Sequence, residues 1–429
     1  MTYKETLEFL YNQLPAYHRI GKAAYKNNLN NTIALDNYLG NPHLKFRTIH
    51  VAGTNGKGSV SHMIASVLQE AGYKTGLYTS PHLKDFRERI RVDGEMIPED
   101  EIVTFVTNHK AFIESLSPSF FEMCVAMAFN HFAENKVDVA VIEVGLGGRL
   151  DSTNIIKPIL SVITNIGTDH MDLLGDSFEK IAYEKAGVIK EKIPLVISET
   201  HPETIGVFKK RAAETGSEIV FSDQKFICTL GENNNSGFPR NYVVEENDTK
   251  LAFSGTTLLG GDYQSKNIQC IYQVFRFLKN VLNISDANIK DGITNVILNT
   301  GLLGRWQIIS HDPLTICDTG HNKEGLEYVM KQLKEIKKTS LHMVIGFVSD
   351  KDLKSVLPLF PNDADYYFTR ASISRALDEK LLQSKAREYG LIGNTYPDVK
   401  SAVAAAKEKS SANDVIFIGG STFIVAEVL

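Results

Sequence analysis

A glycine-rich loop between a short strand and a helix constrains this chain more than any other feature. Residues 46–53, FRTIHVAG, form a β-rich run that ends at the loop GTNGKGS, residues 53–59. Apolar residues then follow at helical spacing from Val60 until Gly72 ends the helix. N–H groups at the start of such a helix point at whatever lies over the loop, and the helix dipole favours an anion there. The pattern predicts a phosphate site, in which Lys57 supplies a charge to a β- or γ-phosphate.

The loop departs from the Walker sequence G-x-x-x-x-G-K-[ST]. Val51 occupies the position of the first glycine, and the hydroxyl arrives one residue late, at Ser59. The alternative for this segment alone is an ordinary β–α turn with a stray lysine.

Strand-like runs alternate with helical patterns along most of the chain, which is typical of a parallel sheet covered by helices. Residues 225–261 change to short β-like pieces around GENNNSGFPRN, which predicts a hairpin excursion from the sheet. At 429 residues the chain exceeds what one hydrophobic core usually supports. We therefore predict an α/β fold with a P-loop-type, mostly parallel sheet domain over residues 1–299 and a smaller, Rossmann-like C-terminal α/β domain over residues 300–429.

Composition narrows the class of protein. The net charge of -5 argues against binding of nucleic acid or of a membrane surface by the whole molecule. The N-terminal segment lacks a secretory apolar core, and no apolar run reaches the ~20 residues that span a bilayer. The four cysteines are far apart with no C-x-x-C spacing, which argues against a zinc knuckle or a disulfide framework. We expect a cytoplasmic monomer.

Polar side chains stand where predicted parallel strands end, the edge at which ligands gather. Ser80 closes one strand, Glu143 ends the apolar run 139–142, and Asp169 and His170 follow another strand. A carboxylate in the position of Glu143 is suited to hold Mg²⁺, and a glutamate at a solvated strand end is the alternative. An isolated histidine such as His170 is weaker evidence for a metal site than Glu143, since a hydrogen-bonded structural role is at least as common.

Lys185 shares a predicted helical face with Phe178, Ile181 and Ala182, so we expect it to point inward. A buried ammonium tends to lose its charge, and a neutral amine can react with CO₂ to give a metal-binding carbamate. The alternative is a lysine whose head reaches solvent. Residues 135–138, NKVD, match the guanine-selecting N-K-x-D but precede their strand, so we interpret them as a helix-to-strand turn.

The second domain opens with DTGHN, residues 318–322, directly after a strand, while Arg305 lies in the connector between domains. Charged groups here are expected to complete a nucleotide site when the domains close. A capped β–α turn with an arginine salt bridge explains these residues equally well.

Taken in order, several motifs resemble the folylpolyglutamate synthase/dihydrofolate synthase family of the Mur ligase superfamily. The motifs are GTNGKGS at 53–59, LYTSPHLKDFRERI at 77–90, VIEVGLGGRLDSTN at 141–154, TNIGTDHMDLLG at 164–175, EKAGVIK at 184–190, GDYQSKN at 261–267, GRW at 304–306 and DTGHN at 318–322. GTNGKGS marks only the superfamily, whereas the segment SPHLKDFRERI favours the folate branch.

The resemblance implies a ligase that uses ATP and two Mg²⁺ ions. Such a ligase phosphorylates the carboxylate of dihydropteroate or of a reduced folate, and L-glutamate then displaces the phosphate. The implied catalytic residues are Lys57, Lys185, His170 and His321. The implied nucleotide contacts are Gly53, Thr54, Asn55, Gly56, Lys57, Gly58, Ser59, Asn267, Arg305 and Asp318. The implied metal ligands are Ser80, Glu143, His170 and a carbamylated Lys185, and the implied substrate contacts are Pro81, His82, Arg87, Asp151 and Ser421.

Three departures from the family pattern affect geometry rather than charge. The usual D-G-A-H-N has Thr319 and Gly320 at its second and third positions, Leu303 replaces a proline, and Tyr263 replaces the histidine of G-x-H-Q. A Mur-type cell-wall ligase is the alternative enzyme, although the loop begins only 52 residues into the chain, with no room for a UDP-binding domain. A regulatory ATPase is the alternative outside ligases. We expect a bifunctional enzyme, although the family also includes monofunctional members.

Overall fold

The computed structural model describes residues 1–14, 28–232 and 239–429. Contacts between residues divide the chain into two compact units. The first holds residues 1–229, 242–256 and 265–301, and the second holds residues 230–241, 257–264 and 302–429. The second unit thus includes two short segments that precede the predicted boundary at residue 300. The division into functional domains at residues 1–299 and 300–429 stays a prediction.

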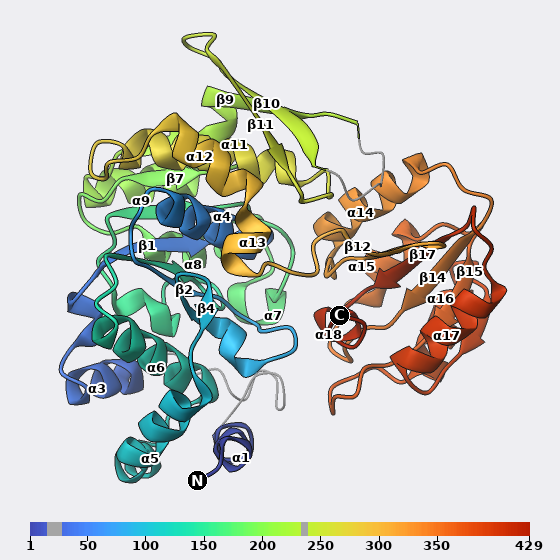
Figure 1. Cartoon of the computed structure of the whole chain (residues 1–429), viewed down its shortest axis with the longest axis horizontal. Coiled ribbons are helices and arrows are strands. Elements are labelled where there is room, and N and C mark those ends of the chain that lie inside the picture. Colours follow the sequence, from blue (N-terminus) through green and yellow to red (C-terminus); the bar gives the residue numbers. More distant parts are fainter. Residues whose placement is uncertain (15–27, 233–238) are drawn as a thin grey trace. The chain divides into compact units, whose positions relative to one another are not determined.

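The first unit is built on an eight-stranded sheet with the order β4-β3-β2-β5-β1-β6-β7-β8 (Figure 1). Its strands are β1 (Arg47–Ala52), β2 (Thr75–Tyr78), β3 (Ile90–Val92), β4 (Glu95–Met96), β5 (Val139–Glu143), β6 (Leu160–Ile163), β7 (Leu195–Ile197) and β8 (Ile219–Phe221). Pairing is parallel among β2, β5, β1, β6, β7 and β8. It is antiparallel where β3 joins β2 and where β4 joins β3. The six parallel strands were predicted from sequence. The edge strands β3 and β4 were not, because charged residues interrupt residues 88–96 and leave no apolar run.

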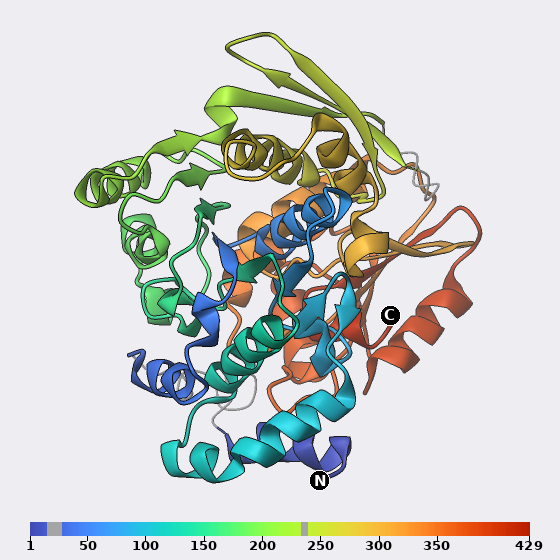
Figure 2. The ribbon, with the colours of Figure 1, turned by 60° about the vertical axis from the view of Figure 1, so that its left-hand side comes forward.

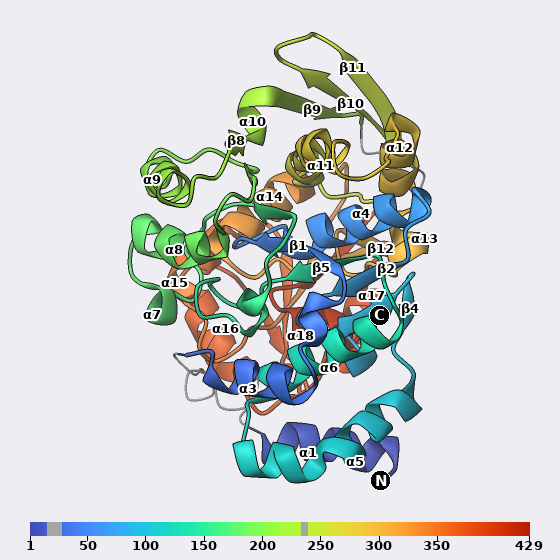
Figure 3. The ribbon, with the colours of Figure 1, turned by 90° about the vertical axis from the view of Figure 1, so that its left-hand side faces the viewer.

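Helices cover both faces of this sheet, with α4 and α11 on one side and α6 and α3 on the other (Figure 3). The helices and 3-10 turns are α1 (Tyr3–Gln13), α3 (Asn30–Tyr38), η2 (Pro42–Leu44), α4 (Lys57–Glu70), η3 (Phe86–Arg89), α5 (Glu99–Leu116), α6 (Phe120–Glu134), η4 (Ser152–Ile155), α7 (Met171–Leu174), α8 (Phe178–Lys185), η5 (Ala186–Val188), α9 (Ile205–Thr215), α10 (Ser222–Lys225), α11 (Gln264–Leu278), α12 (Asp286–Thr294) and α13 (Val296–Thr300). Val60, Ile64 and Val67 of α4 are fully buried, as their helical spacing predicted. Residues 135–138 lie between α6 and β5, so the predicted helix-to-strand turn is confirmed.

A separate sheet occupies the segment that was predicted to be a hairpin. It has three strands in the order β11-β10-β9, namely β9 (Phe226–Leu230), β10 (Arg240–Glu246) and β11 (Ala252–Thr257). The three strands lie next to α11 (Figure 2). Tyr272 of α11 contacts the rings of Phe226, Tyr242 and Phe253, one from each strand. The hairpin prediction was therefore incomplete, because a third strand is needed to cover the apolar face of α11.

The second unit contains a six-stranded sheet with the order β12-β13-β17-β14-β15-β16. The strands are β12 (Gln307–His311), β13 (Leu314–Cys317), β14 (Leu341–Ile345), β15 (Asp365–Phe368), β16 (Gly393–Thr395) and β17 (Val415–Gly419). The helices are α14 (Lys323–Glu335), α15 (Leu353–Val356), η6 (Leu357–Leu359), α16 (Glu379–Arg387), α17 (Val399–Lys409) and α18 (Thr422–Ala426). Pairing is parallel except between β12 and β13. This arrangement confirms the predicted second α/β domain.

Candidate active site

The loop GTNGKGS joins β1 to α4. Gly56 precedes the helix with a φ of 82°, a left-handed conformation that glycine adopts at little cost. A Cβ at Gly56 would lie 2.6 Å from Oδ1 of Asn267, so α11 approaches the loop closely. α4 begins at Lys57, and Gly58 and Ser59 lie in its first turn. N–H groups in a first turn have no partner inside the helix and can bind an anion, as the sequence predicted.

The segment that follows β6 supports this loop. The N–H groups of Thr54 and Asn55 donate to the carbonyl oxygen and to Oδ1 of Asn165, both at 2.9 Å. Oγ1 of Thr164 donates to the carbonyl oxygen of Asn55 at 2.5 Å. A Cβ at Gly53 would lie 1.8 Å from Thr164 Oγ1, which leaves room for glycine alone. The neighbouring strand end therefore helps to fix the conformation of the loop.

Two lysines converge on one carbonyl oxygen of the loop. Lys57 Nζ donates to the carbonyl of Gly53 at 3.1 Å and to that of Thr54 at 3.0 Å. Lys185 Nζ, at the end of α8, donates to the same Gly53 carbonyl at 2.7 Å. Like charges this close repel each other, and an anion over the loop would offset the repulsion. The arrangement is suited to a polyphosphate.

Lys185 is only 4% exposed, which confirms that it points inward. Burial lowers the pKa of Lys185 well below its usual value, and the Lys57 ammonium lowers it further. The carboxylates of Asp169 and Asp151 act in the opposite direction. Because a neutral amine is the form that reacts with CO₂, this environment fits the predicted carbamate. The carbamate itself stays a prediction.

The predicted metal ligands come from three strand ends and α8. Glu143 is 4% exposed, and its Oε2 accepts from the N–H of Ser80 at 3.0 Å, so β5 and β2 bring the two together. His170 is exposed and has a φ of 52°. In the described parts of the chain, no group of three or more His, Cys, Asp or Glu side chains could hold a metal ion.

The predicted ligands nevertheless fit two divalent metals, the first without any modification and the second only after Lys185 is modified. The Glu143 carboxylate and the Ser80 hydroxyl are oxygen ligands of the kind Mg²⁺ prefers, and Mg²⁺ commonly completes its shell with phosphate oxygens and water. As an amine, Lys185 would repel a cation. It fits a second metal only after conversion to a carbamate.

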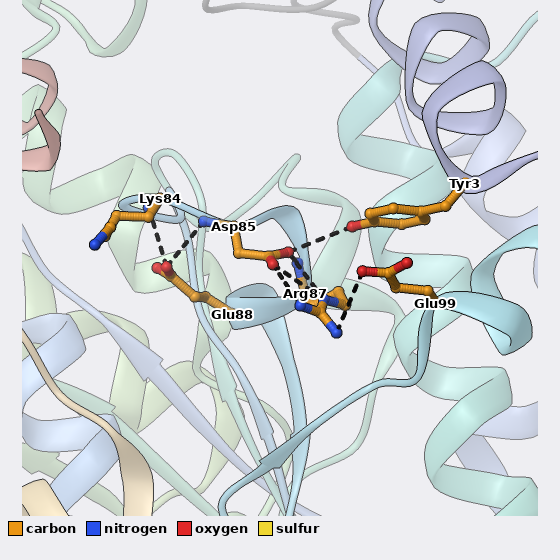
Figure 4. Close-up of polar contacts among 6 residues, drawn as sticks. All are labelled: Tyr3, Lys84, Asp85, Arg87, Glu88 and Glu99. Atoms are coloured by element: carbon orange, nitrogen blue, oxygen red, sulfur yellow. Dashed lines mark hydrogen bonds and ion pairs between the residues drawn. The ribbon is translucent and has the colours of Figure 1, made fainter.

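The predicted substrate contact Arg87 is paired within the protein (Figure 4). Its Nε lies 3.1 Å from both Asp85 oxygens and its Nη2 lies 2.7 Å from Oδ2, while Nη1 is 3.7 Å from Glu99. Tyr3 of α1 also donates to Asp85, at 3.3 Å. Asp85 and Glu88 cap the turn η3 reciprocally. A substrate carboxylate would compete with these partners for Arg87, so its predicted role has no independent support.

The neighbouring residues form a cluster of rings around one cation. Arg89, 5% exposed, donates from Nε to His82 Nδ1 at 2.7 Å and lies 5.2 Å from the centre of the Phe120 ring. Tyr11 of α1 stacks on Phe120 with ring centres 5.2 Å apart. Pro81, joined to Ser80 by a cis peptide bond, is exposed beside this cluster. Phe120 is 3% exposed and is packed by Arg89 and Tyr11, so the predicted substrate contacts of Pro81 and His82 stay predictions.

Asp151 is a buried carboxylate with internal donors. Its Oδ2 accepts from the N–H of Leu146 at 2.8 Å, and its Oδ1 accepts from Thr153 Oγ1 at 2.5 Å and from the Thr153 N–H at 3.0 Å. Burial raises the pKa of Asp151, and these hydrogen bonds oppose the rise. The carboxylate shapes the loop after β5, and its predicted substrate contact stays a prediction.

In the second unit, Asp318 is held by three donors. Its Oδ2 accepts from the Tyr263 hydroxyl and from the N–H of Trp306, and its Oδ1 accepts from the N–H of Gly320, each at 2.7 Å. Burial raises the pKa of Asp318, and the Tyr263 hydrogen bond counters this most strongly. Tyr263 stands where the family pattern has a histidine, so this departure gives Asp318 a phenolic partner.

The other predicted residues of this unit lie at or near strand ends. Arg305 donates to Thr319 Oγ1 and, at 3.3 Å, to the carbonyl of Gly304. His321 Nδ1 lies 3.0 Å from the Thr319 carbonyl oxygen. Ser421 follows β17 and accepts from the N–H of Phe423 at 3.2 Å as the N-cap of α18. Their predicted ligand contacts stay predictions.

Two residues that contact or support the loop, Asn165 and Glu199, were not predicted from sequence. Asn165 lies inside the motif at residues 164–175, in which only Asp169 and His170 were candidates. Glu199 lies two residues after the end of β7 and accepts from Asn165 Nδ2 at 3.0 Å. The signal that selected Glu143, a carboxylate just after an apolar strand, applies equally to Glu199.

Comparison with known families covers both units. Residues 51–267 match the Mur ligase middle domain, and residues 304–422 match the Mur ligase glutamate ligase domain. The dihydrofolate synthase/folylpolyglutamate synthase of Bacillus subtilis (strain 168) is 33% identical over 407 residues, 91% of this chain and 91% of the relative. The folylpolyglutamate synthase of Lacticaseibacillus casei is 34% identical over 361 residues, 82% of this chain and 81% of the relative.

Solved structures share the fold. Escherichia coli FolC in complex with DHPP and ADP has a TM-score of 0.85 and 28% identity, covering 100% of this chain and 97% of the other. A bifunctional folylpolyglutamate synthase/dihydrofolate synthase with Mn, AMPPNP and L-glutamate bound has a TM-score of 0.84 and 26% identity, covering 100% and 97%. ATP and a divalent metal are thus the cofactors of this ligase class. The chain belongs to the dihydrofolate synthase/folylpolyglutamate synthase family of Mur ligases, and it is an ATP-dependent glutamate ligase.

Proposed function

We propose that the enzyme is bifunctional and adds L-glutamate both to dihydropteroate and to reduced folates or their polyglutamates. The names of the Bacillus subtilis and Escherichia coli relatives, which carry both activities, support the proposal. The observation that carries the ligase chemistry is the convergence of Lys57 and Lys185 on the loop carbonyl of Gly53, with the buried carboxylate of Glu143 at the end of the adjacent strand β5. Lys57 offers positive charge for a polyphosphate and Glu143 offers oxygen for a metal, whereas Lys185 is the buried amine that would form a carbamate.

The chemistry requires activation because a carboxylate is a poor acyl donor. An oxygen of the acceptor carboxylate attacks the γ-phosphorus of ATP, the bond from that phosphorus to the bridging oxygen breaks, and ADP leaves. The glutamate amine then attacks the acyl carbon, an amide bond forms, inorganic phosphate leaves and the amine loses a proton. Lys57 stabilises the charge on the phosphate oxygens. A divalent metal, when bound, neutralises further phosphate charge.

The residue roles are proposed as the family resemblance implies them. Residues 53–59 with Asn267 bind the nucleotide, and Ser80, Glu143 and His170 hold metal. Arg305, Asp318, His321 and Ser421 supply nucleotide and glutamate contacts from the second unit, whereas Pro81, His82, Arg87 and Asp151 contact the folate. We assign residues 1–299 to ATP binding and residues 300–429 to glutamate ligation.

Lys185 is proposed to carry a carbamate. Its neutral amine adds to CO₂, a C–N bond forms and one proton is released, which turns a cation into an oxygen ligand. Extra density on Lys185 Nζ in a crystal grown at neutral pH would support this proposal. An unmodified amine in the presence of bicarbonate and metal would contradict it.

The first experiment measures phosphate release from ATP and Mg²⁺ with glutamate and dihydropteroate, then tetrahydrofolate, then neither acceptor. Release with both acceptors, and a product heavier by one glutamyl group, is the expected result. Lys57→Ala should abolish release, while Lys74→Ala, which changes an exposed lysine of the same unit, should not. Release with one acceptor alone would refute bifunctionality. Equal release without an acceptor would favour the regulatory ATPase instead.

We also propose that the enzyme acts as a cytoplasmic monomer, as its net charge of -5 and ordinary composition suggested. No helix in the described segments has the length and apolar character needed to cross a membrane. Light scattering at assay concentration should give the mass of a single chain, 47.7 kDa. A dimer mass would refute the monomer.

A further inference from the structure

The side-chain amide of Asn165 connects the phosphate loop to a carboxylate outside it. Its Oδ1 accepts the N–H of Asn55 at 2.9 Å, and its Nδ2 donates to Glu199 Oε1 at 3.0 Å. Asn165 follows β6 and Glu199 follows β7, and these strands are hydrogen-bonded neighbours. A chain of two hydrogen bonds thus runs from Glu199 into the loop.

The chemistry of the partners allows only one orientation of this amide. The N–H of Asn55 can only donate, and an ionised carboxylate can only accept. The amide of Asn165 therefore satisfies both neighbours only with its oxygen toward Asn55 and its nitrogen toward Glu199. Without the carboxylate, the amide could rotate by half a turn and present hydrogens to the Asn55 N–H, which would release the loop.

The surroundings keep Glu199 in place. Oγ of Ser198, the residue before it, donates to the carbonyl of Lys266 at 3.3 Å and so joins the end of β7 to the start of α11. Burial raises the pKa of Glu199, whereas the Asn165 hydrogen bond and the Lys266 charge lower it. Asn267, the next residue, approaches Gly56. The nucleotide loop, Asn165 and Glu199 therefore belong to one region of the first unit.

We propose that Glu199 is a positioning residue that sets the conformation of the phosphate loop through Asn165. Glu199 acts on the loop through the Asn165 amide and does not touch the reacting atoms. This inference rests on the proposed function only in taking the loop as the nucleotide site.

The test compares Glu199→Ala with Glu199→Gln, using ATP and ADP with Mg²⁺ as probes in calorimetry and steady-state assays. Loss of one charge-assisted hydrogen bond that orders the loop should weaken ADP binding about tenfold and raise the KM for ATP by a similar factor. The kcat at saturating ATP should change by less than about twofold, a split that general destabilisation would not produce. Glu199→Gln retains an acceptor for Asn165 and should restore most of the affinity. Glu203→Ala, an exposed carboxylate four residues on, should match the unaltered enzyme.

A double-mutant cycle with Asn165→Ala tests the route. If Glu199 acts through Asn165, the double variant binds ADP no more weakly than Asn165→Ala alone. Independent, multiplicative losses would mean that Glu199 contacts the ligand directly and would overturn the proposal. Unchanged ADP affinity in Glu199→Ala would also overturn it.

Failure of the proposed function gives a different pattern. ADP binding needs neither folate nor glutamate, so the cycle remains informative if the enzyme turned over only one acceptor or none. Absence of nucleotide binding by the unaltered enzyme would refute the loop assignment, and with it both proposals.

Discussion

Replacing Gly56 by alanine separates the role of the loop from the strain of its backbone. Gly56 has a φ of 82°, and Gly72, at the end of α4, has a φ of 81°. The two positions differ in what a Cβ would meet, because Gly72 has nothing within 4 Å whereas Gly56 has Asn267 Oδ1 at 2.6 Å. Gly72→Ala is thus a control with the same backbone strain and no new contact.

The expected magnitudes follow from this difference. An alanine in the left-handed region costs about 1–2 kcal/mol, so both variants should lose that much stability. The contact at Gly56 is relieved when the end of the Asn267 side chain rotates, without movement of the backbone. Rotation removes Asn267 from its predicted nucleotide contact. One hydrogen bond is worth about 0.5–1.5 kcal/mol net, so ATP affinity should fall roughly 2- to 12-fold in Gly56→Ala alone.

Calorimetric titration with ADP and Mg²⁺ measures affinity, and urea unfolding measures stability. We expect similar unfolding midpoints for the two variants and weaker ADP binding only for Gly56→Ala. Equal ADP affinity in both would show that Asn267 makes no energetic contribution to nucleotide binding. Equal weakening in both would show that the strain of α4, and not the contact, controls the loop.

Three further predictions test other buried groups. Lys185→Met should abolish turnover yet raise the melting temperature, because it removes the cost of burying an amine that is charged in the unfolded chain; normal turnover or a lower melting temperature would contradict this. The pKa of His50 is lowered to about 3 by burial and the charge of Lys190, whereas an unfolded histidine titrates near 6.5. As the pH falls, the unfolded chain therefore takes up the proton before the folded protein does. The free energy of unfolding should fall by up to about 1.4 kcal/mol per pH unit below pH ~6.5. Urea unfolding at several pH values should show a smaller slope for His50→Gln. Tyr263→Phe removes one of three donors to Asp318 and should cost about 1.5–3 kcal/mol of stability. It should also raise the KM for ATP. If neither quantity changed, the idea that Tyr263 holds the Asp318 carboxylate in place would be refuted.

Prediction of the fold from sequence succeeded where one pattern ran through many residues. The parallel strands of the first unit are apolar runs bounded by polar residues. Ile268, Ile271 and Phe275 recur at helical spacing in α11, and all three are fully buried. The strands β3, β4, β12 and β16 were not predicted because polar or charged residues interrupt them, whereas the equally short β7 and β8 are apolar runs. The third strand of the small sheet escaped because its burial depends on Tyr272, far away in sequence.

Sequence patterns predicted where some side chains lie but not which groups they contact. The structure places Ser80 and Glu143 together at adjacent strand ends and buries Lys185, as the strand ends and the helical spacing predicted, whereas their roles stay predictions. The pairing of Arg87 with Asp85 and Glu99 could not be read from sequence, because alternating charges in a loop do not specify which groups meet. Links such as Asn165 to Glu199 depend on which strands are neighbours, and strand order is a property of the folded sheet.

The register of the sheet has a consequence for how this enzyme tolerates change. β6 pairs with β1 through Val51 and Val162, and with β7 through Ile163 and Ile197. Side chains alternate between faces along a strand, so a shift of one residue would turn the side chains beyond β6 toward the opposite face. Apolar residues in the middle of these strands therefore determine the direction in which the side chains at the strand ends point. Substitutions of these apolar residues that loosen the packing should weaken nucleotide binding before they unfold the protein. Loss of activity can therefore arise from core positions far from any ligand.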